Sequence, residues 1–191
     1  MVALASVMLN GQAVPTPDQT PNHPTEPDIQ KASAATRAFK IDFADATLWL
    51  DWLKWFDEKR EPGKITFQHV DRRVLGYVLV DRTPGIPTSK MSDLALRNAM
   101  RLDPDARIRR QEFRQVNGKR MLYLELVLSQ NSPPMVFAGY YHGGVKSNLQ
   151  AVSWTFEKDF DKYRGVMEEF ISGIEIREES ADSLVAMAGQ R

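Results

Sequence analysis

The stretch RIRRQEFRQVNGKRMLYLELVLS, residues 107–129, decides the fold. It holds two runs rich in β-forming residues on either side of Asn117-Gly118. A two-residue hairpin turn of type I′ needs a positive φ at both central residues, and asparagine and glycine tolerate that best. The stretch therefore predicts a β-hairpin made of residues 107–116 and 119–129.

Alternation in the second run assigns its side chains to two faces of a sheet. One face carries leucines only: Leu122, Leu124, Leu126 and Leu128. The other face is mixed: Met121, Tyr123, Glu125 and Val127. We expect the leucine face to lie in the core and the mixed face to be only partly covered.

Two further strands are predicted at MVFAGYYH, residues 135–142, and LQAVSWTF, residues 149–156. The runs are close in sequence, so an antiparallel meander is the simplest topology. Apolar residues then recur at helical spacing up to Ile174, which predicts an amphipathic helix over residues 160–174. Its apolar side must be buried, and the leucine face is the expected place.

Upstream of the hairpin, residues 39–43, 64–69 and 73–81 predict short strands, and residues 89–102 predict a helix. The segment DATLWLDWLKWFDEK, residues 45–59, holds three of the four tryptophans. Its apolar residues fit one helical face, so it is predicted to be a helix packed on the sheet.

Composition narrows the range of functions. The chain has 191 residues, of which 42% are hydrophobic and 26% charged, as is typical of a globular domain. Its 25 basic residues balance its 25 acidic ones, so no overall field attracts nucleic acid, and no nucleic-acid partner is predicted. The absence of cysteine excludes disulfides, cysteine–zinc sites and thiol nucleophiles. The sequence has no apolar run of the roughly 18 residues that a membrane-spanning helix needs.

Three regions are predicted along the chain. Residues 1–34 combine an apolar N-terminus with a proline-rich disordered linker, residues 35–175 form a single α+β domain, and residues 176–191 form a loosely held tail. The apolar run Val2–Leu9 resembles the end of a signal peptide, so export to the periplasm or medium is expected. A cytoplasmic protein with a meaningless apolar start is the alternative.

No catalytic, metal or cofactor site is predicted. The sequence has no G-x-S-x-G motif and no phosphate-binding glycine loop. Its only histidines are His23, His69 and His142, and their spacing does not suggest a metal site. The acidic pairs of the chain fall on expected solvent faces, which argues against a general acid and base.

Two groups of residues remain as candidates for binding. Basic residues crowd the hairpin, and with an aromatic strand end they form the candidate partner surface Arg107, Arg109, Arg110, Arg114, Tyr141 and His142. The simpler interpretation of the arginines, which we favour, is charge that protects an edge strand. Alternation sends Tyr140 and Tyr141 to opposite faces, so one of them should be exposed. The alternative is a ligand pocket between the tryptophan-rich helix and the sheet, lined by Trp49, Trp52 and Tyr123.

The order of these elements resembles the fold shared by PsbP, an extrinsic protein of photosystem II, and the Ran-binding Mog proteins. The likeness rests on LQAVSWTFEKDFDKYRGVMEEFISGI, residues 149–174, and on FAGYYHGG, residues 137–144. It implies an α+β domain with a central antiparallel β-sheet (meander) flanked by helices, an α/β/α sandwich of PsbP-like type. It also implies a non-enzymatic role in binding or assembly, and it transfers no partner and no functional residue.

The sequence therefore predicts a binding or accessory module that acts through another protein. A small-ligand or lipid-binding domain is the alternative.

Overall fold

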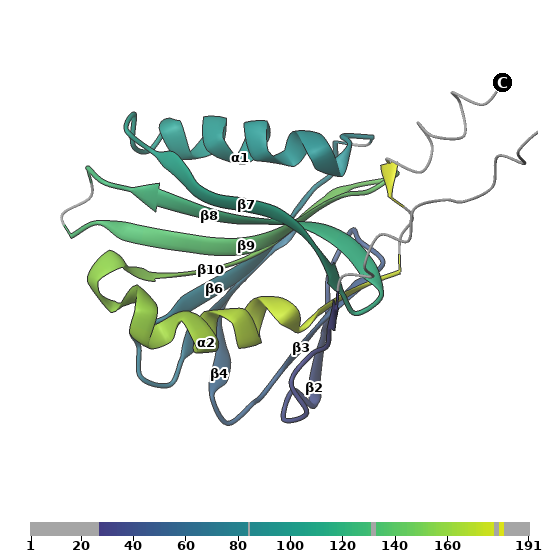
Figure 1. Ribbon diagram of the computed structural model, residues 1–191. Helices are drawn as coiled ribbons and strands as arrows, with labels where there is room; N and C mark the ends of the chain where they lie inside the picture. Colours follow the sequence, from purple (N-terminus) through teal and green to yellow (C-terminus); the bar gives the residue numbers. More distant parts are fainter. Residues whose placement is uncertain (1–26, 84, 131–132, 178–179, 182–191) are drawn as a thin grey trace, which may run out of the picture.

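The computed structural model describes residues 27–83, 85–130, 133–177 and 180–181. Helices and strands follow one another along this part of the chain as labelled in Figure 1. The strands before the first helix are β1 (Asp28–Ile29), β2 (Arg37–Lys40), β3 (Ala46–Leu50), β4 (Trp55–Glu61), β5 (Lys64–His69) and β6 (Leu75–Asp81). The rest are α1 (Met91–Met100), β7 (Arg107–Val116), β8 (Lys119–Leu128), β9 (Met135–Gly143), β10 (Asn148–Phe156), α2 (Phe160–Ser172) and β11 (Ile174–Ile176).

The described strands form two sheets. The larger has eight strands in the order β1-β7-β8-β9-β10-β6-β5-β4, and the smaller has three in the order β11-β3-β2. Only β1 and β7 pair in parallel; the other pairs within the described residues are antiparallel. The meander predicted for residues 107–156 is confirmed as β7-β8-β9-β10, and the domain is α+β.

The turn between β7 and β8 has the predicted geometry. Asn117 has a φ of 46° and Gly118 a φ of 77°, as a type I′ turn requires. The ladder begins at the Val116–Lys119 pair immediately beside the turn. The turn sets which residues face each other from there to Arg110, beyond which the register shifts.

Both faces of β8 are buried, which corrects the prediction that its mixed face is only partly covered. The leucine face packs under α1, against Met91, Ala95 and Ala99. The mixed face belongs to the cluster that contains α2, and even Glu125 on it is buried. The prediction that the last helix covers the leucine face is therefore wrong: α1 and α2 lie on opposite sides of the sheet (Figure 1).

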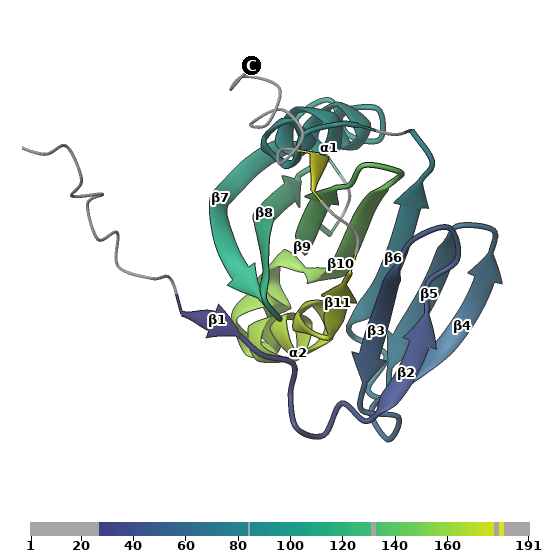
Figure 2. The same cartoon turned by 90° about the vertical axis from the view of Figure 1, so that its right-hand side faces the viewer.

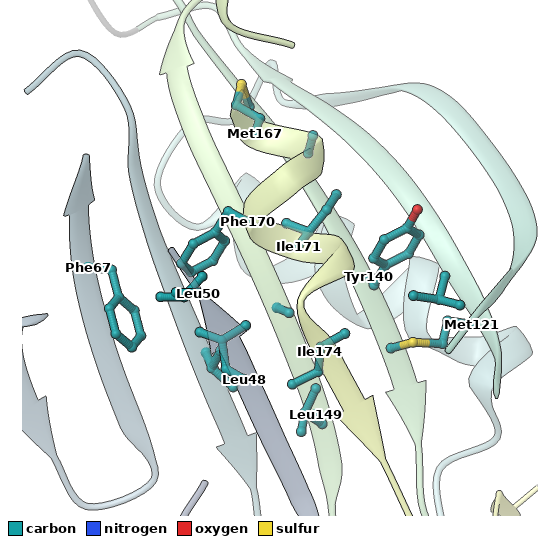
Figure 3. Close-up of a cluster of buried hydrophobic side chains, with 14 of the residues drawn as sticks. Leu48, Leu50, Phe67, Met121, Tyr140, Leu149, Met167, Phe170, Ile171 and Ile174 are labelled. Carbon is teal, nitrogen blue, oxygen red and sulfur yellow. The ribbon is translucent and has the colours of Figure 1, made fainter. Parts of the chain in front are cut away.

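The core on the α2 side is continuous from β8 to the small sheet. Figure 3 shows Met167, Phe170 and Ile171 of α2 pointing into it from the helix. Leu48 and Leu50 of β3 reach the same cluster from the small sheet. The small sheet thus closes the part of this face that α2 leaves open.

The helix predicted at residues 45–59 does not exist; the segment forms β3, a turn and β4. Leu48 and Leu50 alternate into the core, which is a period of two. The carboxylate of Asp51 accepts a hydrogen bond from the Leu53 N–H at 3.0 Å, and its carbonyl accepts one from the Trp55 N–H at 2.9 Å. This local turn breaks the segment, and an aspartate that bonds to backbone two residues ahead is a known turn former.

In the described part of the chain, contacts with the sheet begin within the predicted linker. Asp28 and Ile29 form β1, pair with Gln115 and Val116, and extend the large sheet at one edge (Figure 2). Residues 1–26 lie outside the described residues, so the leader prediction concerns a part of the chain that the structure does not describe. The predicted tail lies outside them too, except for residues 176–177 and 180–181, of which Ala181 is buried.

Candidate functional site

The arginines of β7 are divided by a bulge in the strand. The β7–β8 register shifts between Ile108 and Arg110, so Arg109 is an extra residue. A bulge of this kind places two successive side chains on the same side of the sheet. Arg109 and Arg110 consequently both contact groups on the α2 face, and Arg107 is left at the exposed strand end beside Ser129.

Most of these arginines are held by groups of the same domain. Arg109 donates to Glu125 at 2.9 Å and lies over the Phe160 ring, with its centre 4.3 Å from the ring centroid. Arg114 donates to Glu112 and to the Tyr140 hydroxyl and lies 3.6 Å from the Tyr123 ring centroid. Arg109 and Arg114 therefore act as internal positioning groups between the sheet and α2.

The remaining residues of the predicted partner surface are interior. Tyr141 is 2% exposed and His142 1% exposed, and Tyr140 is buried as well. The prediction that one tyrosine of this strand is a surface aromatic is wrong, because α1 covers one face of β9 and α2 the other. The structure thus does not bring the six predicted residues together on one surface.

The residues of the alternative pocket are also separated. Trp49 donates from its indole N–H to Glu175 at 2.9 Å and carries the Lys31 ammonium over its ring. Trp52 is 59% exposed in the β3–β4 turn, whereas Tyr123 is fully buried and donates to Glu125. The helix that was to form one wall of that pocket is absent, so this version of the ligand hypothesis does not fit the structure.

A different surface emerges on the α1 side of the sheet. Helix α1 packs on β7, β8 and β9, and β6, β5 and β4 extend beyond it toward the other edge (Figure 2). Residues paired across neighbouring strands share a face. One line of such pairs, which we call the cross-sheet row, crosses this region and consists of Phe137, Trp154, Leu75, Gln68 and Phe56.

Four of the five residues of the cross-sheet row are apolar, Gln68 being the exception, and the row becomes more exposed away from α1. Phe137 contacts the α1-side core, and its ring centroid lies 6.0 Å from that of Trp154. Trp154 and Leu75 are half-buried, and Phe56 is 42% exposed at the edge strand. Large apolar side chains left open in a line on a sheet are typical of an interaction surface.

A shallow pocket of about 150 Å³ lies on this row. Its apolar walls come from Leu75, Met135, Trp154 and Phe156, and Arg72 and Arg73 stand at its rim. Both arginines are exposed, and within the described residues neither has an ion-pair partner. The pocket therefore combines apolar and aromatic walls with two exposed positive charges.

Sequence reasoning missed this site because the site depends on strand order. Trp154 and Leu75 are 79 positions apart, and they meet only because β10 pairs with β6. The alternation of Trp154 and Phe156 with Ser153 and Thr155 was a usable signal that one face of β10 carries aromatic residues. Which strand would lie beside it could not be read from that pattern.

The described residues give no support for a metal centre, since no group of three or more histidine, aspartate and glutamate side chains is placed to hold an ion. His69 pairs with Asp71 at 2.9 Å and packs against Trp55. No α-helix in the described part of the chain is both long and apolar enough to cross a membrane.

No protein-family model matches the sequence, and no curated protein matches it either. Solved structures do match. Cyanobacterial PsbP (CyanoP) from Synechocystis sp. PCC 6803 superposes with a TM-score of 0.55 at 12% identity, over 81% of this chain and 99% of that one. A Pseudomonas aeruginosa protein of unknown function gives a TM-score of 0.50 at 11% identity, over 75% of this chain and 98% of that one.

The Ran-binding protein Mog1p of Saccharomyces cerevisiae is more distant, with a TM-score of 0.46 at 6% identity, over 74% of this chain and 96% of that one. Identities this low concern the fold and leave activity and partner open. The chain has the PsbP-like fold that its order of elements predicted.

Proposed function

We propose that this domain is a non-catalytic binding or accessory module that docks on another protein through the cross-sheet row. The observation that carries the proposal is the line from Trp154 to Phe56, apolar except for Gln68, which α1 leaves open. Tryptophan and phenylalanine in such positions supply much of the binding energy of protein interfaces. From Trp154 to Phe56 the row crosses three strand spacings, about 14 Å, which suits one extended segment or helix of a partner.

The charge at the rim indicates what kind of segment would fit. Arg72 and Arg73 flank the Trp154 end of the row, and both are exposed. Guanidinium groups pair well with carboxylates in a fixed, often bidentate geometry. The partner segment is therefore expected to present apolar side chains to Trp154 and Leu75 and acidic side chains to the two arginines.

This proposal moves the partner surface away from the arginines of β7. Arg109 and Arg114 are occupied by Glu125 and Glu112, and releasing Arg109 would leave the buried carboxylate of Glu125 without its guanidinium partner. Arg107 and Arg110 are more exposed and remain available for a comparison. The two surfaces lie on opposite faces of the sheet, so variants can separate them.

Site-specific photo-crosslinking tests the proposal. Phe56 is replaced with p-benzoylphenylalanine, the protein is irradiated in a lysate of the source organism, and the cross-linked peptides are identified by mass spectrometry. We expect one reproducible protein whose cross-linked segment is apolar and acidic. The matched control carries the same photoreactive residue at Phe43, which is 47% exposed on a different part of the fold.

Charge reversal then locates the surface. Arg72→Glu with Arg73→Glu should remove the cross-link from position 56, whereas Arg107→Glu with Arg110→Glu should leave it unchanged. The proposal is wrong if the Phe43 control captures the same protein equally well. It is also wrong if only the β7 double variant abolishes capture.

A further inference from the structure

A second cavity lies between α1 and the sheet and has different chemistry from the cross-sheet row. Its volume is about 110 Å³, and its floor is formed by side chains of β6, β8, β9 and β10. Asn98 and Leu102, both exposed, belong to its lining at the helix end and mark its mouth.

The cavity exists because α1 carries small residues over the sheet. The inward positions of the helix are Met91, Ala95 and Ala99, which are four residues apart and so lie on one face. Met91 is long and fully buried, whereas the two alanines end at Cβ and leave space above Leu126 and Tyr141. The small residues at two inward positions of α1 therefore determine the shape of the cavity.

Two buried polar side chains line this space. Tyr141 is 2% exposed and Gln150 is 7% exposed. In the described part of the chain no hydrogen bond joins the Tyr141 hydroxyl or the Gln150 side-chain amide to another residue, and neither group is among the polar atoms that are sealed from solvent without a partner. Such groups beside an open apolar cavity are suited to a ligand that supplies a hydrogen-bond partner.

Among the described residues, those that line the cavity include no charged side chain. Burial raises the pKa of Tyr77 to about 12 and raises that of Tyr141 well above its usual value, so both hydroxyls keep their protons at neutral pH. A charged ligand would lose its hydration on entering the cavity and would find no opposite charge there to offset that loss of free energy. The lining therefore selects for neutral molecules.

We propose that the cavity under α1 binds a small neutral molecule with one apolar ring or short chain and a hydroxyl or carbonyl head that hydrogen-bonds to Tyr141 and Gln150. The size follows from a known scale, in which an engineered apolar cavity of roughly 150 Å³ holds benzene. A cavity somewhat smaller but open at its mouth fits a single ring whose polar end lies against the strands. This site adjoins the proposed protein-docking surface and shares only Phe137 with it.

Binding of three simple probes tests this inference in the full chain. Phenol has the ring and the neutral head, toluene has the ring with no polar head, and benzoate has a charged head. Titrations are followed by two-dimensional NMR of the amide groups of α1 and β9. We expect phenol to bind at least fivefold more tightly than toluene and benzoate not to saturate.

Two variants place the probe in the cavity. Ala99→Leu should fill the space and abolish binding, whereas the same change at exposed Ala38, Ala38→Leu, should have no effect. Tyr141→Phe should weaken phenol about fivefold and leave toluene unchanged, and this conservative change keeps the test informative if Ala99→Leu does not fold.

Several results would overturn the proposal. One is a titration with phenol that does not saturate at millimolar concentration. Equal binding of phenol by Ala99→Leu and the parent chain, or equal loss of phenol and toluene in Tyr141→Phe, are the others.

Discussion

Asn117 connects three parts of the molecule through one side chain. Its amide donates to the carbonyls of Ser172 and Ile174, both at 2.8 Å, and its carbonyl oxygen accepts from the Lys31 N–H at 2.9 Å. The same residue holds the positive φ that the hairpin turn needs. The turn that the sequence predicts is therefore also the point at which α2, β11 and the N-terminal segment meet.

Replacing Asn117 should separate these two roles. Asn117→Gly keeps a backbone suited to positive φ and loses three hydrogen bonds, so it should reduce the free energy of unfolding by about 2–3 kcal/mol. Asn117→Ala should cost about 1 kcal/mol more, because alanine disfavours the left-handed region. Urea unfolding of the three proteins measures both differences. Equal stability of the parent chain and Asn117→Gly would contradict the linking role.

The interaction of Glu112 with the hairpin arginines should depend on pH. Burial would raise the pKa of Glu112, but the hydrogen bonds and charges of Arg114 and Arg110 outweigh it, and the pKa is lowered. A carboxyl whose folded pKa is depressed stabilises the fold above its unfolded pKa, about 4.3, and this contribution is lost as the pH falls through the folded value.

The expected result is a pH-dependent difference between the parent chain and Glu112→Gln. The gap between their free energies of unfolding should be largest near pH 7 and should shrink below about pH 4. Chemical denaturation at several pH values provides the measurement. A gap that stays constant down to pH 3 would mean that the ionised carboxylate is not what Arg114 stabilises.

At the scale of secondary-structure elements, β8 is a strand buried on both faces. Leu122 and Leu124 lie under α1 on one face, and Met121 and Tyr123 belong to the core on the α2 side of the sheet. A strand buried on both faces tolerates little change in volume, because interiors are close-packed.

Leu124→Ala should lower the free energy of unfolding by about 2–5 kcal/mol, since it removes buried methyl groups and leaves a cavity under α1. The matched control is Leu53→Ala, at a position 68% exposed in the β3–β4 turn, which should change stability by less than about 0.5 kcal/mol. Thermal and urea unfolding compare the two. Similar costs at both positions would show that α1 does not seal this face.

The contact between β6 and α2 depends on a missing side chain. A Cβ placed on Gly76 would lie 2.5 Å from the Phe170 ring, so the ring occupies the space above this glycine. Gly76→Ala should therefore destabilise the protein by about 1–3 kcal/mol. Adding Phe170→Leu to Gly76→Ala should cost less than the sum of the two single changes, a coupling that a double-mutant cycle measures.

The wrong prediction of a helix at residues 45–59 has an identifiable cause. Residues 45–59 place Leu48 and Trp52 four apart, and a spacing of four fits both a helix face and one face of a strand. The turn at Asp51 decides between them, and a single aspartate within an apolar segment is a weak signal. The hairpin and α2 were predicted well because asparagine-glycine and a long 3.6-residue period each have one structural interpretation.

At the scale of the whole molecule, the sequence predicted local elements better than their partners. The β7–β10 meander follows chain order, whereas the β10–β6 pairing and the position of α1 over the leucine face join segments far apart in sequence. The cross-sheet row and the cavity under α1 are both products of these long-range pairings. Composition and periodicity describe one segment at a time and cannot predict them.

The strands near both edges of the large sheet have a bulge and charged side chains. A register shift lies between Asp57 and Lys59 at one edge and between Ile108 and Arg110 at the other, and both strands carry charged side chains. Bulges and charge discourage pairing with another chain's strand. The favoured interpretation of the β7 arginines, protection of an edge, is consistent with this arrangement, although β1 covers the far end of β7.

The contacts of residues 28 and 29 bear on where the folded domain begins. The sequence predicts that the domain begins at residue 35, so a chain starting there should melt like a longer one. The structure argues otherwise: Ile29 packs against the core, the Asn117 N–H donates to the Ile29 carbonyl at 2.9 Å, and the Gly118 N–H donates to the Asp28 carboxylate at 3.1 Å.

We expect a chain of residues 35–191 to be less stable than one of residues 27–191 by about 2–4 kcal/mol, given the lost hydrogen bonds and apolar contact. For a domain of this size the melting temperature should fall by roughly 5–15 °C. Calorimetry of the two chains decides the matter, with Asp28→Ala in the longer chain as an intermediate case. Equal melting temperatures would mean that β1 rests on the sheet without stabilising it, and the domain would then begin where the sequence alone placed it.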